Sequence, residues 1–252
     1  TIIFSIYAII IALLLFYLGG GEILDDFALA FSALSTGGTS PDSKIFQGFT
    51  TPEYVVMIAG MILGALPFGF HYAFVRTKFL SINLTKEVVV YLSLLAIFCI
   101  VFILSMDVNW LDSIFNIVSA STTTGFQTIN FENLNPIAFT VIIMAMTIGG
   151  CGFSTAGGIK IFRFMQLAKL RHIFNIKSVK ISESDRKDII IGIIILATEI
   201  IIPLLVATYM ASMGYDFQNA FFDAVSAITT TGHGAGTVST ALDPFITIVF
   251  GF

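Results

Sequence analysis

Apolar runs long enough to cross a lipid bilayer recur along this chain, and they limit its fold more than any other feature. These runs are Ile2–Leu18, Tyr54–Val75, Val88–Met106, Ile137–Ile148 continuing towards Lys160, Ile189–Met213, and the stretch from Phe245 onward. About 20 apolar residues in a helix cross the hydrocarbon core, and a helix satisfies all of its backbone hydrogen bonds internally. The sequence therefore predicts an all-α polytopic membrane protein.

Composition excludes several other classes of protein. Hydrophobic residues make up 56% of the chain and charged residues 11%, whereas soluble domains carry about 25% charged residues. The net charge of -4 offers no basic face for a nucleic acid. Cys99 and Cys151 lie in apolar runs without a CxxC pattern, so we expect packing residues and neither a disulfide framework nor a zinc site.

Both ends of the chain lie inside apolar runs, at Thr1 and Phe252. We expect the natural polypeptide to be longer at both ends. Because no basic segment or small-residue cleavage site accompanies the first run, we expect it to begin a transmembrane helix and not a signal peptide.

Charged residues divide between the two sides of the predicted membrane topology. One side holds Lys44 alone among the basic residues, and the other holds Arg76, Lys78, Lys86, Lys160, Arg163, Lys169, Arg171, Lys177, Lys180, Arg186 and Lys187. The positive-inside rule places the second group in the cytoplasm. Most acids map to the outer side, where they either attract cations or simply occupy positions from which basic residues are excluded.

A short polar motif occurs three times in the same register. Its pattern is S-A-x-[ST]-T-[GT]-G, and its copies are Ser32–Gly38, Ser119–Gly125 and Ser226–Gly232. Each copy follows an apolar stretch of about 10 to 12 residues, which is too short to span a bilayer. A proline opens the run after each copy, at Pro52, Pro136 and Pro244. The sequence thus predicts three units of helix, re-entrant half-helix, polar loop and helix.

Re-entrant backbone is tolerated at membrane depth where it is buried in protein or lines a watery cavity. Three such loops therefore favour convergence on a central ion pore. Glycine permits backbone angles that let successive carbonyl oxygens face inward and replace the hydration shell of a cation. The half-helices would also direct the negative ends of their dipoles at the cavity.

These motifs resemble the Trk/Ktr/HKT superfamily of potassium transporters, most closely its TrkH-type pore-forming subunits. The resemblance implies M1-P-M2 repeats around one pore, with residues 1–80 as a truncated second repeat, 81–175 as the third, 176–252 as a truncated fourth, and the first absent. It implies that K⁺ binds only backbone carbonyl oxygens of a selectivity filter. The implied filter residues are Ser35, Thr36, Gly37, Gly38, Thr122, Thr123, Thr124, Gly125, Thr229, Thr230, Thr231 and Gly232.

The resemblance further implies a potassium uptake subunit in the cytoplasmic (inner) membrane, with its filter loops facing outside. It implies a homodimer regulated by a cytoplasmic nucleotide-binding RCK-type subunit, and no cofactor in this chain besides the transported potassium ion. The three filter glycines favour potassium. Since a serine in place of the first-repeat glycine accompanies sodium transport in plant relatives, a transporter permeable to Na⁺ and K⁺ remains an alternative.

A glycine-rich run interrupts the span after the second copy of the motif. Each glycine inside a helix costs about 1 kcal/mol relative to alanine, so we expect a broken helix. It resembles the intramembrane loop that obstructs the pore of TrkH-type proteins, although small residues also mark close helix packing. The implied gating residues are Gly149, Gly150, Gly152, Ser154, Thr155, Gly157, Gly158 and Lys160. The similar stretch Gly64–His71 suggests that broken M2 helices are general here.

Other functions explain less of the sequence. A non-conducting scaffold accounts for the spans but not for the tripled motif. An intramembrane hydrolase built on Ser154 or Cys151 lacks a base at helical spacing, so we do not expect an enzyme. Glu199, alone inside a span, is either functional or structural. We expect His71 and His172 at the membrane interface, and His233 at the outer filter mouth, where its charge could affect ion entry.

Overall fold

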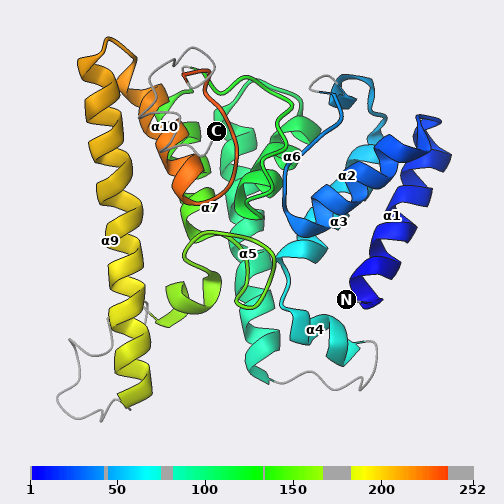
Figure 1. Cartoon of the computed structure of the whole chain (residues 1–252), viewed down its shortest axis with the longest axis horizontal. Helices are drawn as coiled ribbons and strands as arrows, with labels where there is room; N and C mark the ends of the chain where they lie inside the picture. The colour runs from blue at the N-terminus through cyan, green and yellow to red at the C-terminus, as the bar shows by residue number, and fades with distance from the viewer. Residues whose placement is uncertain (1, 43–44, 75–81, 133, 167–182, 238–252) are drawn as a thin grey trace.

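The computed structural model describes residues 2–42, 45–74, 82–132, 134–166 and 183–237, and these contain helices but no strands. The first half contains α1 (Ile2–Gly19), α2 (Ile23–Ser35), the 3-10 turn η1 (Ile45–Gly48), α3 (Thr51–Ala65) and α4 (Phe68–Tyr72). The second half contains α5 (Ile82–Ser105), α6 (Trp110–Ser121), α7 (Pro136–Ile148), α9 (Glu183–Ser212) and α10 (Phe217–Ile228). The all-α prediction is confirmed (Figure 1).

Three of the described helices are long and apolar enough to cross a membrane, through Ile2–Gly19, Lys86–Ser105 and Ile189–Ser212. The helix within the run Tyr54–Val75 is broken, as the stretch Gly64–His71 suggested, since α3 ends at Ala65 and α4 begins at Phe68. Proline disfavours helical angles in the residue before it, and Leu66, which precedes Pro67, is extended with φ -82° and ψ 152°. The predicted span from Phe245 lies outside the described residues.

The helices pack in three successive units. Within the first unit α1, α2 and α3 contact one another, within the second α5, α6 and α7 do so, and in the third α9 contacts α10. Between units, α3 contacts α6 and α7 contacts α10. The same relation, the helix after one motif against the short helix of the next unit, therefore occurs twice (Figure 1).

The helices α2, α6 and α10 are short and share one end of the molecule, the upper half of Figure 1. They have 13, 12 and 12 residues, or about 18 to 20 Å at 1.5 Å per residue, against about 30 Å for the bilayer core. The side chains of Asn109 and Asp216 cap α6 and α10 by accepting backbone amides of Leu111 and Asn219. All three are thus short half-helices, as predicted, and two of them have side-chain caps at their starts.

Buried aromatic rings fill the space between the first two units. Phe46, Tyr54, Phe115 and Phe126 form edge-to-face, tilted and stacked pairs with centroid separations between 5.0 and 6.4 Å. The outward faces of the long helices are apolar as well, with Leu104 and Leu205 82% and 65% exposed. Large exposed apolar faces of this kind suit contact with lipid.

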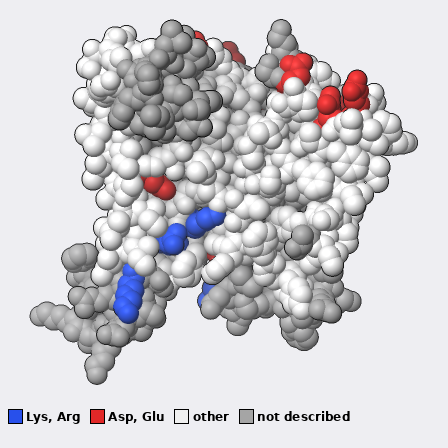
Figure 2. Space-filling model, viewed as in Figure 1, with Lys and Arg blue, Asp and Glu red and all other residues white. Residues whose placement is uncertain are grey.

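Charged side chains gather at two ends of the molecule. Figure 2 shows most visible acidic atoms along the upper edge and the basic atoms in the lower half. This separation agrees with the charge bias that the sequence shows. Which end faces the cytoplasm stays a prediction.

Candidate ion-conduction site

The three motifs adopt one backbone conformation. Within two residues after each short helix, one threonine has a left-handed backbone conformation. The φ angles are 52°, 52° and 59° at Thr36, Thr123 and Thr230. The next backbone amide donates to the carbonyl of the motif's first serine at 2.8 Å in every copy, namely Gly37 to Ser32, Thr124 to Ser119 and Thr231 to Ser226. Equivalent sequences therefore fold into equivalent turns.

The motifs end on glycines in the left-handed region, with φ of 69°, 91° and 88° at Gly38, Gly125 and Gly232. We name the four-residue stretches that end there the Gly38 segment (Ser35–Gly38), the Gly125 segment (Thr122–Gly125) and the Gly232 segment (Thr229–Gly232). Residues with a β-carbon resist these angles, which is one reason for glycine at the last position.

The three segments lie side by side although they are far apart in the sequence. A β-carbon added to Gly38 would lie 2.0 Å from the carbonyl oxygen of Thr124, and one added to Gly125 would lie 2.1 Å from that of Thr231. The Gly125 segment thus lies between the other two. Close approach of the neighbouring backbone is the second reason for glycine here.

The solvent exposure of the segments agrees with the position of the Gly125 segment between the other two. In the Gly125 segment, Thr122, Thr123 and Thr124 are at most 1% exposed. In the Gly38 segment Ser35 and Gly37 are exposed. The middle segment is therefore covered on both sides.

The threonine hydroxyls are engaged within their own segments. Thr122 Oγ1 lies 2.7 Å from Thr124 Oγ1, and Thr229 Oγ1 lies 2.9 Å from Thr231 Oγ1. Thr122 and Thr229 also donate to helix carbonyls four residues back, at 2.8 Å in both cases. With the hydroxyls so occupied, the backbone carbonyl oxygens are the groups that could bind a cation, beside the negative ends of three helix dipoles.

The helix after the second motif is broken, as predicted. Helix α7 ends at Ile148, Gly149 has a φ of 68°, and residues 161–166 are helical again. The intervening intramembrane loop, Gly149–Lys160, closes on itself because the amides of Ile159 and Lys160 donate to the carbonyls of Thr147 and Ile148 at 2.9 and 3.0 Å. The last residues of the loop therefore lie beside the C-terminal end of α7, where the loop begins.

One limb of the intramembrane loop touches the Gly125 and Gly232 segments. The amide of Gly157 donates to Thr123 Oγ1 at 2.5 Å. A β-carbon on Gly157 would lie 2.3 Å from both the carbonyl oxygen of Thr229 and Oγ1 of Thr230. The loop thus lies directly against the helix-proximal ends of these segments.

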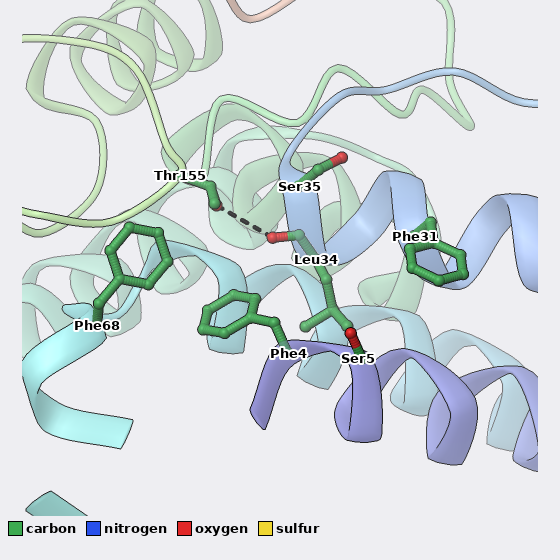
Figure 3. Close-up of a pocket in the computed structure, with 7 residues that line it drawn as sticks. All are labelled: Phe4, Ser5, Phe31, Leu34, Ser35, Phe68 and Thr155. Atoms are coloured by element: carbon green, nitrogen blue, oxygen red, sulfur yellow. Dashed lines mark hydrogen bonds between the residues drawn. The ribbon is translucent and has the colours of Figure 1, made fainter. Parts of the chain in front are cut away.

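The same loop reaches the first unit through Thr155. Its Oγ1 donates to the carbonyl oxygens of Leu34 and Gly64, at 3.1 and 2.8 Å; Figure 3 draws the bond to Leu34 as a dashed line. A cavity of about 500 Å³ opens beside this contact, lined by Phe4, Ser5, Phe31, Leu34, Ser35, Phe68 and Thr155. It borders both the Gly38 segment and the intramembrane loop.

Ser154 and Lys160 stabilise the loop internally. Ser154 Oγ donates to the carbonyl of Cys151 at 2.6 Å, and Lys160 Nζ donates to the carbonyl of Ala156. Gly150 and Gly158 are enclosed by backbone or small side chains, since an added β-carbon would lie 2.6 Å from Ala156 Cβ at Gly150 and 2.8 Å from the Met146 carbonyl oxygen at Gly158. The sequence-predicted gating residues are thus brought together in one compact loop.

Residues 76–252 match the model of the TrkH family, described as a cation transport protein. The chain belongs to the TrkH family. An uncharacterized cation transporter of Methanocaldococcus jannaschii is 32% identical, over 94% of this chain and 52% of that protein. The Trk system potassium uptake protein TrkI of Halomonas elongata is 28% identical, over 90% of this chain and 50% of that protein. The chain spans about half the length of the curated relatives it matches.

Structural comparison agrees with the family assignment. The crystal structure of the potassium transporter TrkH from Vibrio parahaemolyticus superimposes with a TM-score of 0.70 at 18% identity, covering 95% of this chain and 62% of that one. The fold is therefore that of TrkH. The relatives carry transporter names, in agreement with the prediction that this TrkH-family chain is not an enzyme.

Sequence reasoning missed Glu87, which holds the loop of this TrkH-family chain from outside. Its side chain is 8% exposed on α5, and Oε1 accepts the amide of Gly152 at 2.5 Å. The carboxylate also accepts the backbone amide of Phe162, just beyond the loop. An acid at the very start of an apolar run is the signal that could have identified it.

His233 lies next to Gly232, and its ring is buried there. It is 3% exposed, and its ring lies 4.9 Å, edge to face, from that of Phe131. Neither ring nitrogen has a hydrogen-bond partner within the described part of the chain. Burial lowers the pKa of His233 to about 3, which favours the neutral ring over the charged ring that the expected effect on ion entry requires.

The other singled-out titratable residues are also buried. His71 is 2% exposed, and its Nε2 lies 3.0 Å from the Leu63 carbonyl oxygen; its position at the membrane interface stays a prediction. Glu199 is 8% exposed on α9. Cys99 and Cys151 are free thiols, as predicted. His172 lies outside the described residues.

Proposed function

We propose that this chain is part of the pore-forming subunit of a potassium uptake system and conducts K⁺ across the cytoplasmic membrane. The observation that carries the proposal is the adjacency of the Gly38, Gly125 and Gly232 segments, each behind a half-helix with the same turn. The potassium uptake proteins among its relatives support potassium as the ion.

Conduction follows from the chemistry of the three segments. Carbonyl oxygens replace water around the ion, and the half-helix dipoles favour a positive charge at the centre. Because Gly157 and Thr155 attach the intramembrane loop to all three units, the loop obstructs the inner side of the filter. Ion passage then requires the loop to move away from Thr123 and Leu34.

The proposal includes partners and orientation. The filter loops face outside and the basic end faces the cytoplasm, in line with the charge separation in Figure 2. Two pore subunits form a homodimer, and a nucleotide-binding RCK-type subunit binds at the cytoplasmic end. Most of the basic stretch Lys169–Lys187, proposed to bind it, lies outside the described residues, which resume at Glu183.

Uptake of K⁺ and Na⁺ into potassium-transport-deficient cells expressing the full-length parent tests this function. Potassium-preferring uptake is expected, with the preference lost in Gly125→Ser, where an added β-carbon would meet the Thr231 carbonyl oxygen at 2.1 Å. Gly214→Ser is the matched control, because Gly214 has a similar φ of 96° but no atom within 4 Å.

The outcomes separate the alternatives. Equal uptake of both ions by the unaltered protein would favour a Na⁺- and K⁺-permeable transporter. Uptake of neither ion by an inserted, folded protein with its regulatory subunit present would favour a scaffold. An unchanged ion preference in Gly125→Ser would contradict the filter assignment.

A further inference from the structure

A polar side chain on the half-helix anchors the loop beyond the Gly125 and Gly232 segments. Asn116 lies nine residues before Gly125, and its Oδ1 accepts the amide of Thr128 at 3.1 Å while its Nδ2 donates to Thr128 Oγ1 at 2.6 Å. The side chain is fully buried. Asn116 therefore ties α6 to the chain three residues beyond the glycine.

Asp223 occupies the same register in the next unit, nine residues before Gly232. Its Oδ1 accepts the amide of Ala235 at 2.5 Å and its Oδ2 accepts that of Thr237 at 3.1 Å. The residue is 2% exposed. A carboxylate with two backbone donors is a strong, directional anchor, and it ties α10 to the chain at the equivalent place.

The first unit has a different pair at these positions. Leu29 lies nine residues before Gly38 and is fully buried. The position three residues beyond the glycine is Pro41, which has no backbone N–H to donate. The first unit therefore has an apolar residue at the position of the polar anchors, and a proline at the position of the backbone amide that they accept.

A second device joins the Gly125 and Gly232 segments directly. Gln127 lies two residues beyond Gly125, and Gly234 lies two residues beyond Gly232. Gln127 Nε2 donates to the Gly234 carbonyl, and its Oε1 accepts the Gly234 amide, both at 3.1 Å. The equivalent residue in the first unit, Ser40, instead donates within its own loop to Asp42. The reciprocal pair thus spans two units at the outer end of the filter.

We propose that Gln127, Asn116 and Asp223 are positioning residues that set the spacing of the Gly125 and Gly232 segments and thereby determine cation selectivity. The inference rests on the proposed filter function and adds residues outside the filter motifs. Ions of different size are distinguished by the geometry and number of carbonyl oxygens. Residues that hold those carbonyl oxygens in place therefore affect ion selectivity more than they affect the folding and insertion of the protein.

Gln127→Met in the full-length protein tests the link between units. Methionine keeps the length of the side chain but removes both hydrogen bonds to Gly234 and the bond from Nε2 to the Ile129 carbonyl. We expect the K⁺ over Na⁺ uptake ratio to fall about tenfold, a factor that corresponds to about 1.4 kcal/mol. Gln218→Met is the matched control. Gln218 makes the same kind of bond, Nε2 to the Leu134 carbonyl at 2.9 Å, but away from the filter, so its ratio should not change.

Asp223 supplies a second, independent variant. Asp223→Asn keeps an acceptor for one amide and loses the other, whereas Asp223→Leu loses both, so the loss of selectivity should be larger in Asp223→Leu. Partial rescue by asparagine is expected at equal amounts of inserted protein, measured by surface labelling. A purely structural role would change the amount of protein and leave the ratio unaltered.

Failure of this inference differs from failure of the proposed function. If Gly125→Ser abolishes selectivity but Gln127→Met and Asp223→Asn keep the normal ratio, the positioning role is overturned and the filter stands. If Gly125→Ser also keeps the normal ratio, the filter assignment itself is wrong.

Discussion

Two glycine-rich regions of this chain meet, and they are held in different ways. In the filter segments, the β-carbon positions of Gly38 and Gly125 face backbone carbonyls of the neighbouring unit at 2.0 and 2.1 Å. In the intramembrane loop, that of Gly149 faces the Gly157 carbonyl of the same loop at 2.2 Å. The proposed filter segments thus meet through close backbone contact between units, whereas the loop combines bonds within itself with bonds to the first unit.

Three side chains attach the loop to the rest of the chain and can be removed one at a time. They are the hydroxyls of Thr123 and Thr155 and the carboxylate of Glu87. Backbone amides also join the loop to the first unit, from Cys151 to Ala65, from Thr155 to Gly64 and from Phe68 to Phe153. Under the proposed function, the side-chain contacts are the ones whose loss would release the loop from the filter.

The largest expected effect is that of an alanine in the filter. Gly125→Ala should reduce K⁺ uptake more than tenfold, because its β-carbon has no space beside Thr231. Gly214→Ala carries only the backbone strain of a positive φ, roughly 1–2 kcal/mol, and should keep near-normal uptake. Ion flux per inserted molecule measures both. Equal losses in the two variants would mean that strain, and not contact between units, explains the filter glycines.

Removing one attachment of the loop should raise K⁺ flux, whereas the filter substitution lowers it. Thr155→Val keeps the shape of the side chain but removes the hydroxyl that bonds Leu34 and Gly64. We expect K⁺ flux to rise several-fold, because a net hydrogen bond of about 1 kcal/mol no longer holds the obstructing position. Ser154→Ala, which removes a bond inside the loop, is the control. Unchanged flux in Thr155→Val would argue against a displaceable loop.

A smaller effect is expected at Glu87. Glu87→Leu leaves the amide of Gly152 without its acceptor, a loss of about 1–3 kcal/mol. Glu87→Gln keeps a neutral acceptor. Thermal unfolding of the purified protein in detergent should show a lower melting temperature for leucine than for glutamine. If glutamine destabilises as much as leucine, the charge and not the hydrogen bond is the important property.

The smallest effect concerns His233 and pH. Burial lowers its pKa to about 3 in the folded protein, against about 6.5 when unfolded. Above pH 6.5 neither state binds the proton, and below it only the unfolded state does, so stability falls as pH decreases towards 3. At pH 6 the loss is about 1 kcal/mol. His233→Phe should remove this dependence, measured as the melting temperature between pH 7.5 and 5.

The broken helices show how far sequence reasoning reached. The break after Ile148 was predicted because several glycines in one run oppose a helix. The break at Leu66 was likewise suggested by the glycine and proline of the stretch Gly64–His71. Asn116, Asp223 and Gln127 were missed, since their partners are backbone groups that leave no trace in side-chain patterns.

The sequence by itself determined the membrane class, the half-helices and the tripled motif, because hydrophobic length and local turn preferences depend on neighbours along the chain. Only the tertiary structure decided that Gly125 lies between Gly38 and Gly232, that Gly157 meets Thr123, and that His233 is buried against Phe131. These are contacts between residues distant in sequence. Their energies depend on distances and burial that packing alone establishes.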